Sequence, residues 1–141
     1  MKRTILSVIA IVLLVGISSC SKIPEEKVTI AFDKWSAANE NTATRLQSAK
    51  SDKEVADILI AHAEDIKMSA AIIHSLRIKY KDGLDENQAY KLGKLKAENS
   101  GKKLNAELIE IAEKYKNSDE LLTAYGKMES IIKEAQTSAG K

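Results

Sequence analysis

Cysteine, proline and aromatic residues are all scarce in this chain of 141 residues. It contains one cysteine and one proline, and aromatic side chains make up 4% of it. A single cysteine cannot form an intramolecular disulfide, so a disulfide-stapled scaffold is excluded. The only proline, Pro24, leaves the rest of the chain free of the residue that most strongly interrupts helices. These absences favour an all-α fold.

Long apolar runs are also missing. The longest, residues 5–17, has thirteen residues, whereas a helix that crosses a bilayer needs about 20. Lys2 and Arg3 precede the run, and this order is typical of the positively charged start and apolar middle of a signal peptide. We therefore expect residues 1–19 to be a signal peptide that is absent from the mature protein.

The stretch after this run, Ile17-Ser18-Ser19-Cys20, resembles the lipobox of bacterial lipoproteins. The resemblance implies that the Cys20 thiolate receives a diacylglycerol, that cleavage follows Ser19 and that the protein is anchored to a membrane of the cell envelope by this lipid. Ser21 stands where aspartate would retain an enterobacterial lipoprotein in the inner membrane. Its presence implies the outer membrane, and the bundle could face either the periplasm or the cell surface. The alternative is ordinary secretion with a free Cys20.

No excess of either charge remains once the signal peptide is removed. Residues 1–19 hold two basic residues, Lys2 and Arg3, and no acidic one, so the totals of 22 basic and 20 acidic residues become 20 and 20. A neutral chain has no basic field to attract a polyanion. Nucleic acid is therefore not an expected partner.

Apolar residues after Pro24 recur with the helical period rather than the alternating period of strands. Ser51 with Glu54 forms a capping-box pattern at the start of a second helix. The expected organisation is a lipidated linker over 20–26, one bundle domain over 27–136 and a flexible tail over 137–141. The first stripe is Val28, Phe32, Trp35, Asn39, Thr42, Leu46 and Ala49, and the second is Val55, Leu59, His62, Ile66, Ser69, Ile73, Leu76 and Tyr80.

A third helix is expected to start near Asp85 and Gln88, after a stop at Gly83, and to pass through Gly101 in one register, with a bend or break there as the alternative. An interior glycine costs only about 1 kcal/mol relative to alanine. The stripe of the third helix is Tyr90, Lys94, Ala97, Gly101, Leu104, Leu108, Ile111 and Tyr115, and that of a fourth is Leu121, Tyr125, Met128, Ile132 and Ala135.

Four such helices with short connections predict an antiparallel up-down-up-down four-helix bundle. Turning the first two helices at Lys50 and Ser51 brings Asn39, Thr42 and His62 to one level. This layer is the only place in the expected core where polar side chains gather. We expect His62 to bond Thr42 or Asn39 and to fix the register of the helices, because buried polar groups need partners.

Motifs for catalysis and for cofactors are missing from the sequence. It has no Glu-x-x-His pair, no Cys-x-x-Cys-His, no glycine-rich phosphate loop and no nucleophile elbow. We expect no enzymatic activity, no cofactor and no metal. The expected function is a tethered interaction or structural module that binds an envelope protein. Two alternatives stay open: a carrier of a small ligand or haem at the His62 layer, and a self-assembling structural lipoprotein.

Overall fold

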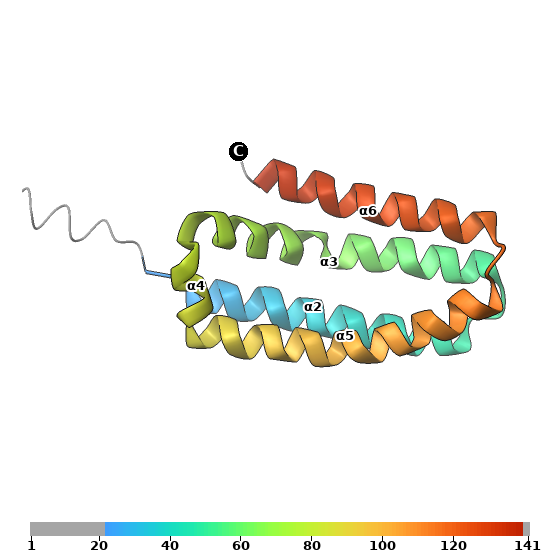
Figure 1. The fold of residues 1–141 in the computed structure, drawn as a ribbon, viewed down its shortest axis with the longest axis horizontal. Coiled ribbons are helices and arrows are strands. Elements are labelled where there is room, and N and C mark those ends of the chain that lie inside the picture. The colour runs from blue at the N-terminus through green and yellow to red at the C-terminus, as the bar shows by residue number, and fades with distance from the viewer. Residues whose placement is uncertain (1–21, 140–141) are drawn as a thin grey trace, which may run out of the picture.

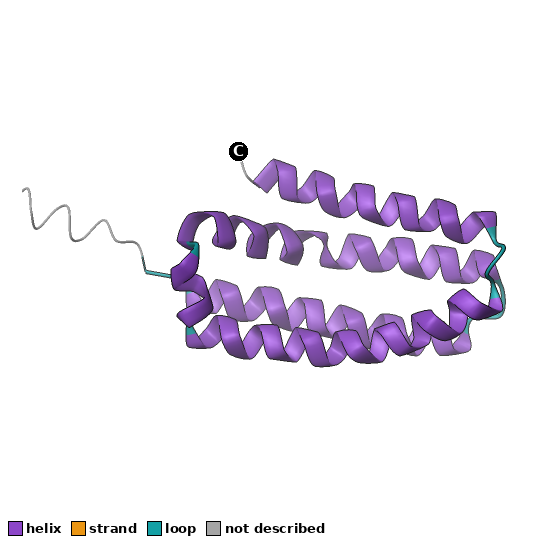
Figure 2. Ribbon diagram, viewed as in Figure 1, coloured by secondary structure: helices purple, strands orange, loops and turns teal. Residues whose placement is uncertain are grey.

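The computed structural model describes residues 22–139, which form five helices and contain no strand. The helices are α2 (Glu25–Ser48), α3 (Asp52–Tyr80), α4 (Asp82–Glu86), α5 (Gln88–Lys114) and α6 (Asp119–Ala139). Figures 1 and 2 show the long helices lying lengthwise beside one another, with the short α4 at one end. The predicted all-α bundle is confirmed.

The start of α3 follows the capping pattern in the sequence. The Ser51 hydroxyl accepts the backbone N–H of Glu54 at 3.2 Å, and the Glu54 carboxylate accepts the backbone N–H of Lys50 at 2.8 Å. Both bonds satisfy donors that the first turn of a helix leaves free. The predicted helix start at Ser51 is confirmed.

The turn between α3 and α5 differs from the prediction. The helix α3 ends one residue before Lys81, whose φ of 41° is positive, and Gly83 lies inside α4 rather than ending a helix. The cap of α5 is Asn87, whose side chain accepts the backbone N–H of Tyr90 at 3.0 Å, so the start predicted at Asp85 is wrong. A five-residue helix such as α4 shows too little periodicity to be found by a search for stripes.

Across the bundle the long helices lie in the order α6, α3, α2, α5, which Figure 1 shows from top to bottom. Successive long helices run in opposite directions, yet the neighbours α2 and α5 are parallel. Asn87 bonds Glu25 near the start of both helices at 3.0 Å, and Gln47 bonds Glu107 near their ends at 2.7 Å. The neighbours α3 and α6 are parallel too.

This order leaves the up-down-up-down arrangement, with each helix beside its neighbour in sequence, unconfirmed. Among the described residues, the backbone of α5 does not come close to that of α3 or of α6, although side chains of the three helices meet in the core. The short α4 contacts both α3 and α5 and carries the chain from the end of α3 to the far side of α2. The result is a bundle with a central antiparallel pair, α2 and α3, and two outer helices.

Two apolar clusters form the core, one toward each end. We call near cluster the one beside the start of α2 and far cluster the one at the turn between α2 and α3. The near cluster is Val28, Ala31, Phe32, Ile73, Leu76, Leu84 and Tyr90. The far cluster is Ala43, Leu46, Val55, Ala56, Ile58, Leu59, Leu104, Ile111, Leu121 and Ala124.

The bounds of the helices were only partly predicted. The helix α5 continues through Gly101 without interruption, as expected. The helix α6 runs to Ala139, into the segment 137–141 that was expected to be a flexible tail, and the Ser138 hydroxyl donates to the carbonyl of Glu134 at 2.9 Å. The helix α2 begins at Glu25, two residues before the expected start of the bundle at 27.

Both clusters and the contacts between helices described above lie within residues 22–139. A chain of this length is an ordinary single domain that can bury its own core. Residues 21–141 are therefore expected to fold without the leading segment.

Candidate functional site

The predicted polar layer lies between the near and far clusters. The hydroxyl of Thr42 on α2 is 2.9 Å from Nδ1 of His62 on α3, and both side chains are buried. This bond joins the two central helices at the level that the turn at Ser51 predicted. Thr42 and His62 are thus brought together as expected.

Asn39, the third predicted member, turns to the other side of α2. Its Nδ2 donates to the Ser100 hydroxyl at 3.1 Å and points to the Ala97 carbonyl at 3.5 Å. Ser100 is 3% exposed, although it does not belong to the apolar stripe predicted for the third helix. It was missed because the prediction did not make α5 a direct neighbour of α2, where Ser100 faces that helix. The layer therefore consists of two bonded pairs rather than one group of three.

Burial controls the protonation of His62. Desolvation lowers the pKa of its imidazole below the ordinary value of 6.5, while the charge of Asp65 and a hydrogen bond to the Ala38 carbonyl act in the opposite direction. The ring is therefore held mainly in its neutral form at neutral pH. A neutral ring with Thr42 and Ala38 as partners is a satisfied core histidine.

The polar layer lacks the set of side chains that would bind a metal or haem. Within residues 22–139, no three His, Cys, Asp or Glu side chains come close enough together to hold a metal ion. His62 is 4% exposed and its ring is already hydrogen bonded. No observation at this layer therefore favours a carrier that uses His62. The geometry supports the structural role in fixing register.

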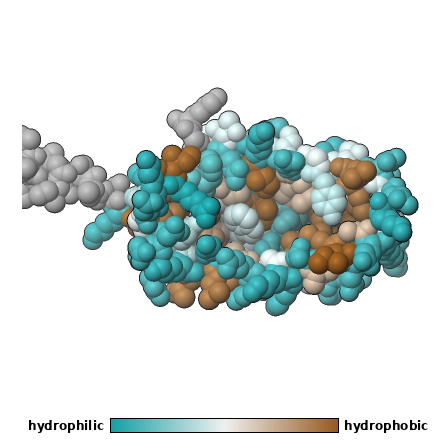
Figure 3. Space-filling model, viewed as in Figure 1, coloured by the Kyte–Doolittle hydropathy of each residue, from teal (hydrophilic) through white to brown (hydrophobic). Residues whose placement is uncertain are grey.

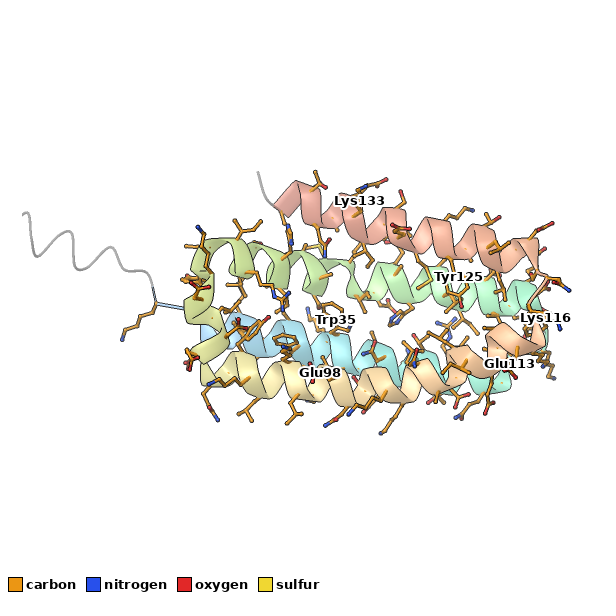
Figure 4. The ribbon with its side chains drawn as sticks, viewed as in Figure 1. Trp35, Glu98, Glu113, Lys116, Tyr125 and Lys133 are labelled. Carbon is orange, nitrogen blue, oxygen red and sulfur yellow. The ribbon has the colours of Figure 1, made fainter. Side chains whose placement is uncertain are left out.

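The surface between α5 and α6 is open to solvent. The face between α5 and α6 has no helix across it, so side chains of α2 and α3 form its floor. In Figure 3, brown and pale residues occupy much of the middle of this face, and hydrophilic residues in teal line most of its rim. Figure 4 shows Trp35 in the middle of the same face, between the ribbons of α2 and α3.

Beside Trp35 lies a hollow of about 210 Å³, to which all four long helices contribute; we call it the Trp35 hollow. The Arg77 side chain at its wall donates from Nε to the Tyr90 hydroxyl at 2.8 Å, and this bond raises the pKa of the guanidinium above its ordinary value. The lining residues are Phe32, Trp35, Ala70, Ile73, His74, Arg77, Tyr90, Lys94 and Gln136.

The sequence held one clue to this hollow. Lys94 interrupts the apolar stripe of α5 between Tyr90 and Ala97, and a lysine on an inward face is unusual unless it reaches solvent or an anion. His74 and Arg77 gave no clue, because each stands beside, rather than on, the stripe of α3. Only the order of the helices brings the three basic residues together.

The predicted lipidation site, Cys20, lies outside the described residues, as does the whole of the expected signal peptide 1–19. From residue 22 to residue 139, no helix combines the length and the apolar character needed to cross a membrane.

Comparison with known proteins gives no relative. The chain matches no protein family, no curated protein and no solved structure.

Proposed function

We propose that this chain is a bacterial envelope lipoprotein, anchored through lipid on Cys20, whose helical bundle binds another envelope protein. The observation that carries the proposal is the stretch Ile17-Ser18-Ser19-Cys20 behind a short apolar run and two basic residues. The chain has no other cysteine that could serve as the lipid acceptor or as a disulfide partner.

The anchor chemistry follows from the cysteine. The Cys20 thiolate displaces the headgroup-bearing phosphate of a phospholipid, the new thioether holds a diacylglycerol, and peptide cleavage after Ser19 leaves Cys20 as the first residue. Each buried methylene contributes about 0.8 kcal/mol, and two chains hold a protein at a membrane where one alone holds it marginally. Lipid would therefore replace a transmembrane helix as the anchor.

The bundle would stand close to the bilayer. The helix α2 begins at Glu25, and the residues from Cys20 to Glu25 span at most about 17 Å when fully extended. In the proposed arrangement, the near cluster and α4 face the membrane and the far cluster points away from it. Ser21 in place of aspartate favours the outer membrane.

Exposed apolar side chains support a binding role for the bundle. Leu92 and Leu95 lie three residues apart on α5 and so share one side of the helix. They are 58% and 55% exposed, although large apolar groups prefer burial. Adjoining exposed apolar side chains are typical of surfaces that contact another protein. We place the partner contact on this outer side of α5.

The anchor is tested by cell fractionation. The wild-type chain is expected in the membrane fraction, whereas Cys20→Ala should lose lipidation and cleavage after Ser19 and should accumulate as precursor. Ser21→Ala is the matched control and should behave as wild type. A Cys20→Ala chain that is still cleaved after residue 19 would contradict the lipoprotein proposal and would support ordinary secretion.

The partner contact is tested by a photocrosslinking amino acid at Leu95, with Glu113 on the same helix as the control position. A crosslink to one envelope protein from position 95, absent from position 113 and weakened by Leu92→Glu, is the expected result. A crosslink only to a second copy of the chain would instead indicate self-assembly. Glu113 lies about five turns along the same side of α5, so equal labelling from both positions would contradict a partner site confined to Leu92 and Leu95.

A further inference from the structure

We infer that the Trp35 hollow binds the anionic head of a single-chain amphiphile, such as a fatty acid, and that the adjoining open side of α6 holds its acyl chain. The inference concerns a different surface from the partner contact proposed at Leu92 and Leu95. It also does not depend on the lipid at Cys20.

The charge of the hollow points to an anion. Three basic side chains, His74, Arg77 and Lys94, line it together with the amide of Gln136, and no carboxylate is among the lining residues. Guanidinium and ammonium groups form charge-assisted hydrogen bonds with carboxylates and phosphates. A histidine ring can add an N–H donor in either protonation state. The hollow is therefore suited to a small anionic group.

Nearby acids leave these cations available. Glu98 lies 4.0 Å from the Lys94 ammonium one turn along α5, and both side chains are about half exposed. Such an exposed pair contributes little, because water screens it and both side chains must lose freedom to form it. Asp85 contributes only the weakest influence on Arg77, after its bond to Tyr90.

The shape of the surface indicates an apolar tail. A second hollow of about 520 Å³ on α6 is lined by Met128, Glu129, Ile132, Lys133 and Gln136. Gln136 also lines the Trp35 hollow, so the two adjoin. Met128 and Ile132 are only partly buried, although both belong to the apolar stripe of α6. An acyl chain lying along them would cover this surface.

The volume of the Trp35 hollow excludes larger ligands. The Trp35 hollow, at about 210 Å³, is below the range of about 300–1,000 Å³ that is usual for drug-sized ligands. It can take a carboxylate or phosphate but not a haem or a folded segment. The combination of a small cationic hollow with an adjoining apolar surface matches one chain with one charged end.

Trp35 provides a direct probe, because it is the only tryptophan in the chain and lines the hollow. Residues 21–141, made without lipid, are titrated with sodium laurate below its micelle concentration. Fluorescence follows Trp35, and isothermal titration calorimetry provides the stoichiometry. We expect saturation at one laurate per chain with a change in Trp35 emission.

Pairs of variants then test separately the binding of the carboxylate head and of the acyl chain. Lys94→Gln should weaken laurate binding about tenfold, the effect of losing one charge-assisted contact. Lys103→Gln is the matched control on the same helix, since its ammonium also lies near a carboxylate, Glu40, at 3.9 Å, but outside the hollow. Ile132→Asp should weaken laurate binding, whereas Leu122→Asp on the exposed side of α6 should not.

Two further probes complete the test. Dodecanol has the chain without the charge, and inorganic phosphate has a charge without the chain, so both should bind at least tenfold more weakly than laurate. Equal binding of dodecanol, or no effect of Lys94→Gln, would overturn the cationic head site. Phosphate binding as tight as laurate would overturn the role of the apolar surface. Calorimetry without any laurate signal would overturn the inference as a whole. None of these results bears on lipidation of Cys20 or on a crosslink from Leu95.

Discussion

The two ends of the bundle are closed in different ways. At the far end, α6 contributes Leu121 and Ala124, so side chains from all four long helices form an aliphatic cluster. At the near end, α6 contributes none of the buried residues, and the short α4 supplies Leu84 instead. The near cluster contains an aromatic pair, Phe32 and Tyr90. Their ring centroids lie 5.4 Å apart in an edge-to-face arrangement. The fourth long helix thus completes the core at one end and leaves it open at the other.

This difference explains where the Trp35 hollow lies. Where α6 packs into the core, as at Leu121, the space between helices is filled with apolar side chains. Where it does not, Trp35 remains partly exposed and basic side chains of α3 and α5 reach the gap. A bundle with one incompletely covered end can therefore be stable and still offer a concave, charged surface.

The largest expected effect concerns the aromatic pair. Phe32→Ala should lower the free energy of unfolding by about 3–5 kcal/mol, because it removes a ring that is 4% exposed and leaves a cavity beside Tyr90. Urea denaturation measures the loss. The exposed Ile30 on the same helix is the control, and Ile30→Ala should change stability by less than about 0.5 kcal/mol. Equal losses in the two variants would contradict the near cluster.

Two glycines on α5 differ in how closely the helix approaches α2 at each of them. A Cβ on Gly93 would lie 2.3 Å from Cδ2 of Phe32, whereas one on Gly101 would meet only the Asn39 amide at 3.8 Å. Gly93→Ala should destabilise the fold by about 1–3 kcal/mol through overpacking. Gly101→Ala should stabilise it by up to about 1 kcal/mol, since alanine favours helix. Thermal unfolding of both variants tests this, and a tolerated Gly93→Ala would mean that α2 and α5 are not in close contact there.

The polar layer between the clusters should make stability depend on pH. Because burial lowers the pKa of His62, the unfolded chain binds a proton more readily than the folded one. The contribution of His62 to the free energy of unfolding should therefore be complete above about pH 6.5. It should fall as the pH drops from there toward the lowered pKa of the folded state, by at most about 1.4 kcal/mol per pH unit.

The variant His62→Leu isolates this contribution. It should stay folded but lose about 1–3 kcal/mol of stability at neutral pH, because the buried Thr42 hydroxyl loses its hydrogen-bond partner, and it should lose this part of the acid dependence. Urea denaturation at several pH values is the measurement. An unchanged pH profile in the variant would show that other groups cause the acid dependence.

The smallest effect is expected at the turn into α4. Lys81 has a φ of 41°, which a glycine adopts without strain. Lys81→Gly should raise the free energy of unfolding by about 0.5–1 kcal/mol, because relief of strain exceeds the added freedom of the unfolded chain. Lys79→Gly, inside the last turn of α3, should lower it by a similar amount. A loss of stability in Lys81→Gly would contradict the strained turn.

Much of each helix could be predicted from its own residues, because the helical period, the capping box at Ser51 and the level of His62 are local properties. The order of the helices could not. An apolar stripe packs equally well on a parallel or an antiparallel neighbour, so the stripe of α5 does not reveal that Ser100 faces Asn39. Without that order, neither the second bonded pair nor the meeting of Arg77 with Lys94 beside Trp35 was predictable.

The lipid-anchored bundle is tested most directly by the intact mass of the protein extracted from membranes of the cell that produces it. The expected mass is that of a chain that begins at Cys20 and carries a diacylglycerol, with or without a further acyl group on its amino terminus. A chain that begins at residue 20 without acyl mass, or one that retains residues 1–19, would contradict it.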